Sequence, residues 1–323
     1  MFFLGIDIAK RTMAVALLRP DGKWRSKSVA NTADGHDALL AWVGHHAPDG
    51  PVHVCLEATG TYGTAVAETL HNAGHRVSIV NPAAIEAFSR SRLSRTKTDP
   101  TDARLIALFC RAQEPPPWTP LPRELRELQA LVRRLDALEG MRQQERNRLE
   151  AAPDSAVVCA SIQHLLDTLD DEMTALKDQI HDHFDRHPPL RQQRDLLTSI
   201  PGIGAATAAV LLAEFGLMRR FAQARQCAAF VGVVPRERRS GTSLHGKPML
   251  SKLGSAAVRK ALYYPALTAL RCNPIVIALR DRLRGKGKHP MAIVGAAMRK
   301  LVHLAYGVLK TDQPFDPNFS QTR

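Results

Sequence analysis

The first 114 residues of this 323-residue chain follow a pattern that few folds satisfy. Three β-rich segments separated by short polar turns come first, at 2–8, 13–18 and 26–30. Helical and strand patterns then alternate, at 33–45, 52–56, 62–72, 77–80 and 83–89, before a helix at 98–111. Three strands in a meander followed by alternating helices and strands predict an α/β domain with a mixed sheet.

The order of these segments is that of a ribonuclease-H-like fold, and it gives two acids a shared location. Asp7 lies on the first predicted strand and Glu57 at the tip of the fourth. Both then fall at the carboxyl edge of the sheet, where open α/β sheets bind their ligands. An Asp within an apolar strand is locally unfavourable, and such violations tend to mark function. For Asp7 alone, a solvent-facing acid at a strand end is the alternative.

Two further acids, Asp99 and Asp102, lie three residues apart at the predicted start of the helix over 98–111. Asp99 is expected at the N-cap, Pro100 at the first helical position and Asp102 at the third. One interpretation is a plain helix N-terminus whose acids cap the backbone and complement the helix dipole. The other is that residues i and i+3 share a face and bind one divalent metal.

The net charge of +13 lies almost entirely in the last part of the chain. Residues 191–323 hold 22 Lys/Arg and 6 Asp/Glu, whereas 1–115 hold 13 and 11 and 116–190 hold 9 and 14. This concentration is typical of a polyanion-binding surface. The cations are not confined to one amphipathic helix, which disfavours a membrane, and the aromatic content of 5% disfavours a stacking platform for single strands. We therefore expect a nucleic-acid backbone as the partner.

Cysteine usage and hydropathy bear on the compartment. The five cysteines are scattered without a CxxC pair, which predicts reduced and mostly buried thiols. The apolar start, Met1–Leu4, is too short for a signal peptide, and no stretch approaches the roughly 18 uncharged apolar residues of a membrane span. We expect a soluble, cytoplasmic protein.

Five prolines between 115 and 122 indicate a domain boundary. Beyond it, apolar residues recur every three or four positions along 125–138 and again along 162–180, which predicts an antiparallel coiled-coil hairpin. Its acidic outer face argues against DNA contact. A spacer and an oligomerisation arm are both compatible with this pattern, and oligomerisation is favoured. The predicted domains are 1–114, 115–190 and 191–323.

His181, His183 and His187 cluster near the end of this hairpin. The flanking acids and the following Pro188-Pro189 indicate a solvated helix end rather than a metal site.

The segment 199–204, Ser-Ile-Pro-Gly-Ile-Gly, lies between two apolar helical patterns and resembles a helix-hairpin-helix element. Small residues such as Gly202 and Gly204 let backbone N–H groups and a helix N-terminus approach a phosphate. Such an element would position nucleic acid without reading its bases. The alternative is a glycine-rich helix connection with no ligand. The rest of 191–323 is expected to be mainly helical.

Farther along, a serine next to a glycine lies among arginines. Ser240 precedes Gly241, and the cations around it are Arg236, Arg238, Arg239, Lys252, Arg259 and Lys260. A serine among guanidinium groups has the ingredients of a nucleophile that attacks phosphate. No histidine is clearly paired with it as a base, although His245 is near in sequence. The alternative is a phosphate-binding loop whose serine only donates a hydrogen bond.

These motifs together resemble a known family. Asp7, the run 57–62 (EATGTY) and the run 98–103 (TDPTDA) are similar to the Asp-Glu-Asp-Asp tetrad of RuvC-type nuclease domains. More narrowly, they resemble the insertion-sequence transposase family numbered one hundred and ten, which includes the Piv-type DNA invertases. The block around Ser240 resembles the second motif block of that family. Gly254-Ser255 and Val258 stand where the family often has Gly-Asn and Leu.

The resemblance implies a RuvC-like domain in which Asp7, Glu57, Asp99 and Asp102 bind Mg²⁺ or Mn²⁺ at a phosphodiester. It aligns Ser240 with the family's proposed covalent nucleophile, with Ser243 as the fallback. It also implies double-stranded DNA as substrate, both element ends and target, and a structured noncoding guide RNA from the element. We expect a homo-oligomer, dimer or tetramer, associated with the bacterial nucleoid.

The predicted function is that of a DNA recombinase, or transposase, that cuts and rejoins DNA through a phosphoserine intermediate. Because the two motif blocks lie far apart in sequence, one active site could combine different protomers. One alternative is a RuvC-like junction nuclease that uses water and has no need of Ser240. The other is a non-catalytic nucleic-acid scaffold whose acids are structural.

Overall fold

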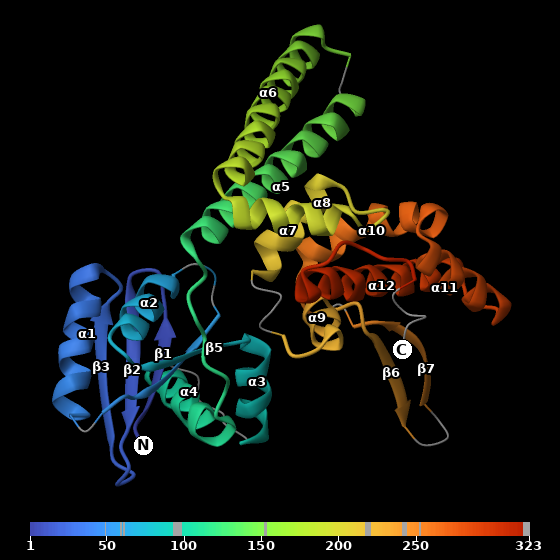
Figure 1. Cartoon of the computed structure of the whole chain (residues 1–323). Coiled ribbons are helices and arrows are strands. Elements are labelled where there is room, and N and C mark those ends of the chain that lie inside the picture. Colours follow the sequence, from blue (N-terminus) through green and yellow to red (C-terminus); the bar gives the residue numbers. More distant parts are fainter. Residues whose placement is uncertain are drawn as a thin grey trace. The chain divides into compact units, whose positions relative to one another are not determined.

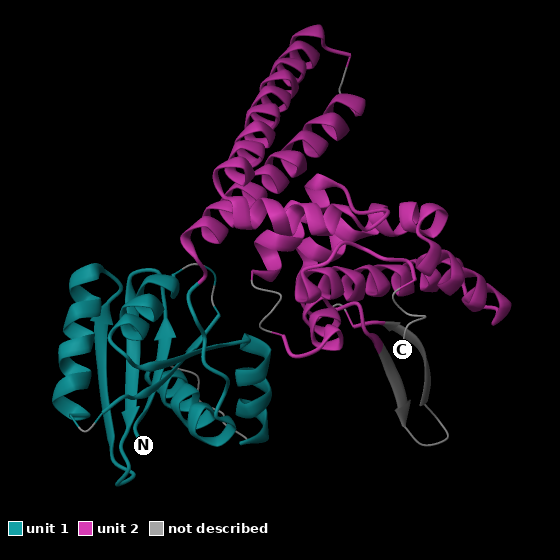
Figure 2. Cartoon of the chain, viewed as in Figure 1, with its two compact units in different colours: residues 1–120 teal, residues 121–323 magenta. Residues whose placement is uncertain are grey.

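The computed structural model describes most of the chain (Figure 1). The described residues are 1–48, 50–58, 60, 62–92, 99–151, 154–216, 221–240, 244–251 and 253–318, without the side chains of 99, 236–240 and 244–249. The chain forms two compact units, Met1–Pro120 and Leu121–Arg323 (Figure 2). Each is described by itself below.

Unit 1 is built on a five-stranded mixed sheet of order β3-β2-β1-β4-β5. The strands are β1 (Phe3–Ile8), β2 (Thr12–Leu18), β3 (Trp24–Ala30), β4 (His53–Glu57) and β5 (Arg76–Val80). The first three pair antiparallel, and β4 pairs parallel to both β1 and β5. The predicted meander and mixed sheet are confirmed, and they are consistent with a ribonuclease-H-like domain.

Helices cover both faces of this sheet. Successive side chains of β1 point to opposite faces, and those on both faces are buried. They are α1 (Ala33–His46), α2 (Thr64–Asn72), α3 (Pro82–Ser91) and α4 (Asp99–Gln113). Leu4 and Ile6 of β1 share a core with residues of α1 and α2, whereas Phe3 belongs to a second core with residues of α3 and α4. Odd-numbered residues of β1 therefore face α4, and this parity determines which side of the sheet Asp7 lies on.

The proline-rich segment after α4 is anchored to the sheet of unit 1. Ser78 on β5 donates to the carbonyl oxygens of Pro115 and Pro116, both at 3.0 Å, and accepts from His53 Nε2 at 2.9 Å. The Trp118 N–H donates to the Val77 carbonyl oxygen at 2.7 Å. His53 is fully buried, and this burial, with the nearby Arg76, lowers its pKa to about 4. The anchor is therefore an uncharged hydrogen-bond chain at neutral pH.

Unit 2 is mainly helical. Its helices are α5 (Arg123–Glu150), α6 (Ala156–Arg186), α7 (Pro188–Thr198), α8 (Ala205–Phe215), α9 (Ala224–Val231), α10 (Ala256–Cys272), α11 (Pro274–Gly285) and α12 (Pro290–Thr311). The sequence did not predict its two-stranded antiparallel sheet, β6 (Pro235–Ser240) and β7 (Leu244–Leu250). Charged residues fill β6, so the apolar alternation that marks a strand is missing there.

The core of unit 2 gathers around α12, whose Leu301, Val302 and Ala305 are fully buried. This helix is long and apolar enough to span a membrane by length and composition, but 61% of its most apolar window is buried in the core. Leu128 of α5 and Phe184 of α6 belong to the same core. The base of the long helical hairpin is therefore continuous with the helices that follow it. The division into three domains stays a prediction.

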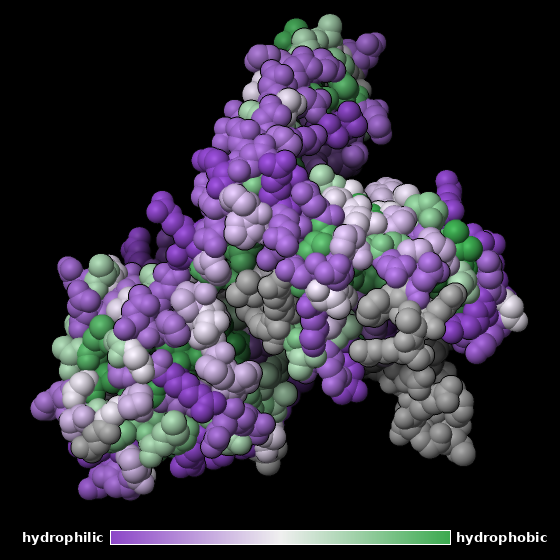
Figure 3. Space-filling view, in the orientation of Figure 1, coloured by the Kyte–Doolittle hydropathy of each residue, from purple (hydrophilic) through white to green (hydrophobic). Residues whose placement is uncertain are grey.

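The outer part of the hairpin is held by its own small core of Leu138, Leu169 and Met173. An ion pair between Arg142 and Asp170, at 2.7 Å, joins α5 to α6. Hydrophilic residues cover most of the face of the hairpin shown in Figure 3, with hydrophobic ones gathered near its tip. The two helices lie where the repeat predicted them, and their supercoiling stays a prediction.

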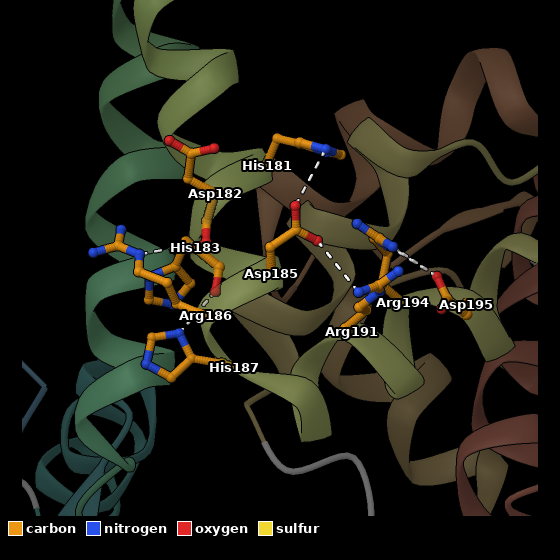
Figure 4. Close-up of polar contacts among 9 residues, drawn as sticks. All are labelled: His181, Asp182, His183, Asp185, Arg186, His187, Arg191, Arg194 and Asp195. Atoms are coloured by element: carbon orange, nitrogen blue, oxygen red, sulfur yellow. Dashed lines mark hydrogen bonds and ion pairs between the residues drawn. The ribbon is translucent and has the colours of Figure 1, made fainter.

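The histidine cluster lies where α6 meets α7 (Figure 4). His183 is fully buried, and its Nε2 bonds to the Glu124 carbonyl oxygen of α5 at 2.9 Å. His187 Nδ1 bonds to the His183 carbonyl oxygen at 2.7 Å, and His181 lies 3.5 Å from Asp185. The predicted solvated helix end is wrong for His183, because α5 packs over that side of α6. Burial lowers the pKa of His183.

Candidate functional site

The register of two parallel strands brings Asp7 and Glu57 to one place. β1 and β4 pair residue by residue from Phe3–His53 to Ile6–Leu56. Asp7 and Glu57 come next on the two strands, so they lie side by side at the carboxyl edge and on the same face. Both side chains are half-buried.

Helix α4 crosses this same face very closely. A Cβ at Gly5 would lie 2.0 Å from the Ala103 carbonyl oxygen and 2.4 Å from the Ala107 nitrogen, so only glycine fits there. At the other end of the helix, Cys110 Sγ donates to the carbonyl oxygen of His53, the first residue of β4. The helix therefore runs from the carboxyl edge toward the start of the strands.

This direction brings the first turn of α4 to the edge where Asp7 and Glu57 lie. Asp102, directly before Ala103, is half-buried in that turn. α4 begins at Asp99, whose side chain lies outside the described residues. Strand register and close helix packing thus bring three predicted acids, Asp7, Glu57 and Asp102, to one side and one edge of the sheet.

Carboxylate oxygens are the ligands that Mg²⁺ and Mn²⁺ prefer, so the donor chemistry of this edge fits a hard divalent cation. Among the described side chains, no three from His, Cys, Asp and Glu gather tightly enough to form a complete metal-holding group. The identity of the ion and the assignment of its ligands stay predictions.

The predicted nucleophile lies at the end of a strand. Ser240 is the last residue of β6 and pairs with Leu244 of β7 across the hairpin. Arg236, Arg238 and Arg239 lie on the same strand, with a register irregularity between Arg236 and Arg238. The side chains of these four residues, and all of Ser243 and Lys252, lie outside the described residues. Their roles stay predictions.

The predicted helix-hairpin-helix segment is the turn between α7 and α8. Gly202 has a φ of +104°, and a Cβ there would lie 2.9 Å from the Ala269 Cβ of α10. Asn273 Nδ2 donates to the Pro201 carbonyl oxygen at 3.2 Å. Gly204 is exposed, and none of the described side chains caps the start of α8 that follows it. One glycine of the motif therefore packs inward, and the other leaves a helix N-terminus open to solvent.

Two predicted cations have partners within the protein. The Arg259 guanidinium donates to the carbonyl oxygens of Val231, at 2.8 Å, and Gly254, at 3.1 Å. The Lys260 ammonium bonds to Asp136 of α5, which raises the pKa of this lysine. The sequence did not predict these contacts. Those of Arg259 end on backbone oxygens, and Lys260 bonds to a residue far away in the chain.

Two domains known from other proteins match the chain in the predicted order. Residues 4–156 match the DEDD-type transposase domain of IS110 elements, and residues 194–280 match the domain described as "Transposase IS116/IS110/IS902 family". This chain belongs to the IS110 family. It is an enzyme of DNA transposition or recombination, and the predicted family resemblance is confirmed.

Individual relatives support the membership of this IS110-family transposase. Pilin gene-inverting proteins of Moraxella bovis and Moraxella lacunata are each 33% identical to it over 316 residues, 97% of either chain. The "Insertion element IS110 uncharacterized 43.6 kDa protein" of Streptomyces coelicolor is 31% identical over 146 residues. That match covers 45% of this chain and 35% of the Streptomyces protein. The similarity to the two Moraxella proteins therefore extends through both units.

Proposed function

We propose that this transposase cuts double-stranded DNA at the ends of its element and at a target, and rejoins the strands in a new order. The observation that carries the proposal is the register of β1 and β4, together with the membership of the chain in the IS110 family. This register sets Asp7 and Glu57 side by side on the face where α4 begins. An acidic edge of this kind suits chemistry at a phosphodiester.

In this proposal Asp7, Glu57, Asp99 and Asp102 hold Mg²⁺ or Mn²⁺. When bound, such a cation polarises the scissile phosphate and stabilises charge on the leaving oxygen. The protein's part is to hold the carboxylates at a fixed separation and to exclude alternative positions of the phosphate.

We further propose that Ser240 is the nucleophile and Ser243 the fallback. The Ser240 hydroxyl loses its proton to solvent or a base, and its oxygen forms a bond to phosphorus. The bond from phosphorus to the leaving sugar oxygen breaks, and that oxygen keeps the electron pair and takes up a proton. Attack by the freed end of another strand reverses these changes and releases the serine. The arginines on β6 supply positive charge for the phosphoryl oxygens.

Unit 2 supplies the nucleic-acid surface in this proposal. The open start of α8 after Gly204, the arginines of β6 and Lys252 contact phosphates. The turn at Gly202, which packs against α10, holds that helix start in place. Base pairing with a structured noncoding RNA of the element then reads the sequence of donor and target, while the protein reads the backbone. The charge excess in 191–323 and the low aromatic content support this division.

The tip of the hairpin supports a homo-oligomer, dimer or tetramer. Val157 is 81% exposed there, and Val158 and Leu165 of the same helix, with Met141 of α5, are also exposed. Apolar side chains in solvent on a long projecting hairpin suit contact with another copy. We place the oligomer on the bacterial nucleoid in the cytoplasm.

The test combines the full-length protein with DNA bearing its element ends, Mg²⁺ and RNA transcribed from the noncoding flank. A protein–DNA adduct that survives denaturation is expected in the wild type and in Ser243→Ala, and it is expected to be lost in Ser240→Ala. Asp102→Asn is expected to reduce cleavage about 100-fold or more while DNA binding persists.

Other outcomes redirect the assignment. Nicked DNA without an adduct, equal in wild type and Ser240→Ala, would identify a nuclease that uses water. An adduct lost in Ser243→Ala and kept in Ser240→Ala would move the nucleophile three residues along the chain.

A further inference from the structure

Asn31 occupies the corner between β3 and α1, at the edge of the sheet where Asp7 and Glu57 lie. β3 ends at Ala30, which pairs with Thr12, the first residue of β2. The turn that leads into Thr12 follows directly from the end of β1 at Ile8. The corner, the β1–β2 turn and the end of β4 therefore share one edge of unit 1, as can be followed in Figure 1.

One side-chain amide joins three segments at this corner. Asn31 Nδ2 donates to the carbonyl oxygens of Ala9 and Tyr62, both at 3.1 Å. Its Oδ1 lies 2.9 Å from Nε2 of His36, a buried residue of α1. The Asn31 backbone N–H also donates to the Arg11 carbonyl oxygen at 2.9 Å. Ala9 comes two residues after Asp7, and Tyr62 comes five residues after Glu57.

These contacts fix the chemistry of position 31. Two carbonyl oxygens face Nδ2, so the amide nitrogen must point toward them and Oδ1 toward His36. The Nε2 of His36 then carries the proton and donates to Oδ1. A carboxylate at position 31 has no hydrogen for either carbonyl, and its charge would face two acceptor oxygens. The corner thus requires an amide, although it lies among backbone groups rather than beside the acids themselves.

We propose that Asn31 is a positioning residue for the acidic edge. It ties Ala9, two residues after Asp7, to Tyr62, which lies just before α2, and so adds a side-chain tie to the β1–β4 pairing beside the acids. This inference rests on the proposed binding of a divalent cation by Asp7 and Glu57. Metal affinity is sensitive to displacements of about 0.5 Å in ligand positions. Loss of a group that bonds a ligand directly typically costs 10- to 100-fold in affinity, and Asn31, which bonds to the neighbouring backbone instead, is expected at the lower end of that range.

The test is a Mn²⁺ titration of the full-length protein without nucleic acid, read by calorimetry, with thermal unfolding measured alongside. Asn31→Asp removes the two donated hydrogen bonds. Asn81→Asp is its matched control, because Asn81 follows β5 at the same edge and its Oδ1 accepts from the Ala83 N–H at 2.9 Å. An aspartate performs that capping role equally well. Both variants add one negative charge at the same edge of the sheet.

We expect Asn31→Asp to bind Mn²⁺ about 10-fold more weakly than Asn81→Asp. Electrostatics alone predicts equal or tighter binding for both variants, because each adds a negative charge near a cation. A purely structural role for Asn31 would lower the unfolding temperature and leave the affinity of the folded protein equal to that of Asn81→Asp. Equal affinities would overturn the inference.

A second pair of variants serves if Asn31→Asp fails to fold. His36→Leu removes the donor that orients the Asn31 amide, whereas His36→Gln keeps an N–H at a similar position. Weaker Mn²⁺ binding in the leucine variant and recovery in the glutamine variant are expected. Equal binding in the two would count against the inference.

Asp7→Asn separates this inference from the proposed function. If Asp7→Asn loses Mn²⁺ binding and Asn31→Asp matches Asn81→Asp, the metal site stands and the role of Asn31 is wrong. If the wild type and Asp7→Asn bind Mn²⁺ equally, the metal proposal fails and the inference fails with it.

Discussion

Charged residues are concentrated in two regions, the acidic edge of unit 1 (Asp7, Glu57 and Asp102) and the basic segments of unit 2. The positions of these residues are fixed by different kinds of contact in the two units. In unit 1, strand register positions Asp7 and Glu57, and an uncharged close contact at Gly5 brings α4 to them. In unit 2, Arg259 and Lys260 are themselves contacts of the fold.

Because of this difference, the number of basic residues in a segment does not equal the number available to bind a polyanion. The 22 basic residues of 191–323 are an upper bound on the cations offered to a polyanion, because some of them already bond within the protein. At the acidic edge, the pairing of β1 with β4 and the close approach of α4 at Gly5 set where the acids lie along the sheet.

The largest effect is expected from closing the gap at Gly5. In Gly5→Ala the new methyl group would overlap the Ala103 carbonyl oxygen, so α4 must move off the sheet. We expect a loss of about 3 kcal/mol in the free energy of unfolding, measured by chemical denaturation. Gly204→Ala is the control in unit 2, where a Cβ meets nothing within 4 Å, and a loss below about 1 kcal/mol is expected. Similar losses in both variants would contradict the close packing of α4.

Acid should weaken unit 1 through the uncharged anchor at His53. Its pKa is about 4 in the folded protein against an ordinary value of 6.5, so the unfolded chain binds the proton more readily. The stabilisation is therefore complete above pH 6.5 and is lost progressively as the pH falls toward 4. We expect about 2 kcal/mol less stability at pH 4.5 than at pH 7.5 from this group. His53→Gln should remove that share of the pH dependence, and an unchanged slope would disprove the assignment.

Arg259 and Lys260 give the sharpest test of unit 2, because they are adjacent in sequence and differ in environment. Arg259→Met leaves the carbonyl oxygens of Val231 and Gly254 without their charged donor, and a loss of about 2 kcal/mol in unfolding free energy is expected.

Lys260→Met breaks a surface ion pair whose lysine side chain is 61% exposed, and it should cost less than about 1 kcal/mol. If instead Arg259→Met unfolds like the wild type and only weakens DNA binding, Arg259 is a nucleic-acid contact and not a structural one. Filter binding at two salt concentrations separates these results.

Local sequence patterns predicted much of unit 1. The five strands and four helices appear in the predicted order, with end points shifted by a few residues; the helix predicted from Tyr62, for example, begins at Thr64. Local patterns succeed here because β1, β2, β4 and β5 are rich in apolar residues, and because the mostly polar β3 follows a clear turn signal at 20–23. They failed at β6, which is charged along its length, and at His183, which α5 buries from far away in the chain.

The sequence by itself determined the family, the mixed sheet and the locations of Asp7 and Glu57, because strand order and period fix where a residue falls along a sheet. Only the tertiary structure showed that Arg259 and Lys260 have partners inside the protein, and that Asn31 joins Ala9, Tyr62 and His36. Such contacts depend on segments that meet only after folding. Four of these hydrogen bonds, two from Asn31 and two from Arg259, end on backbone oxygens, which every residue carries and which no sequence pattern can mark.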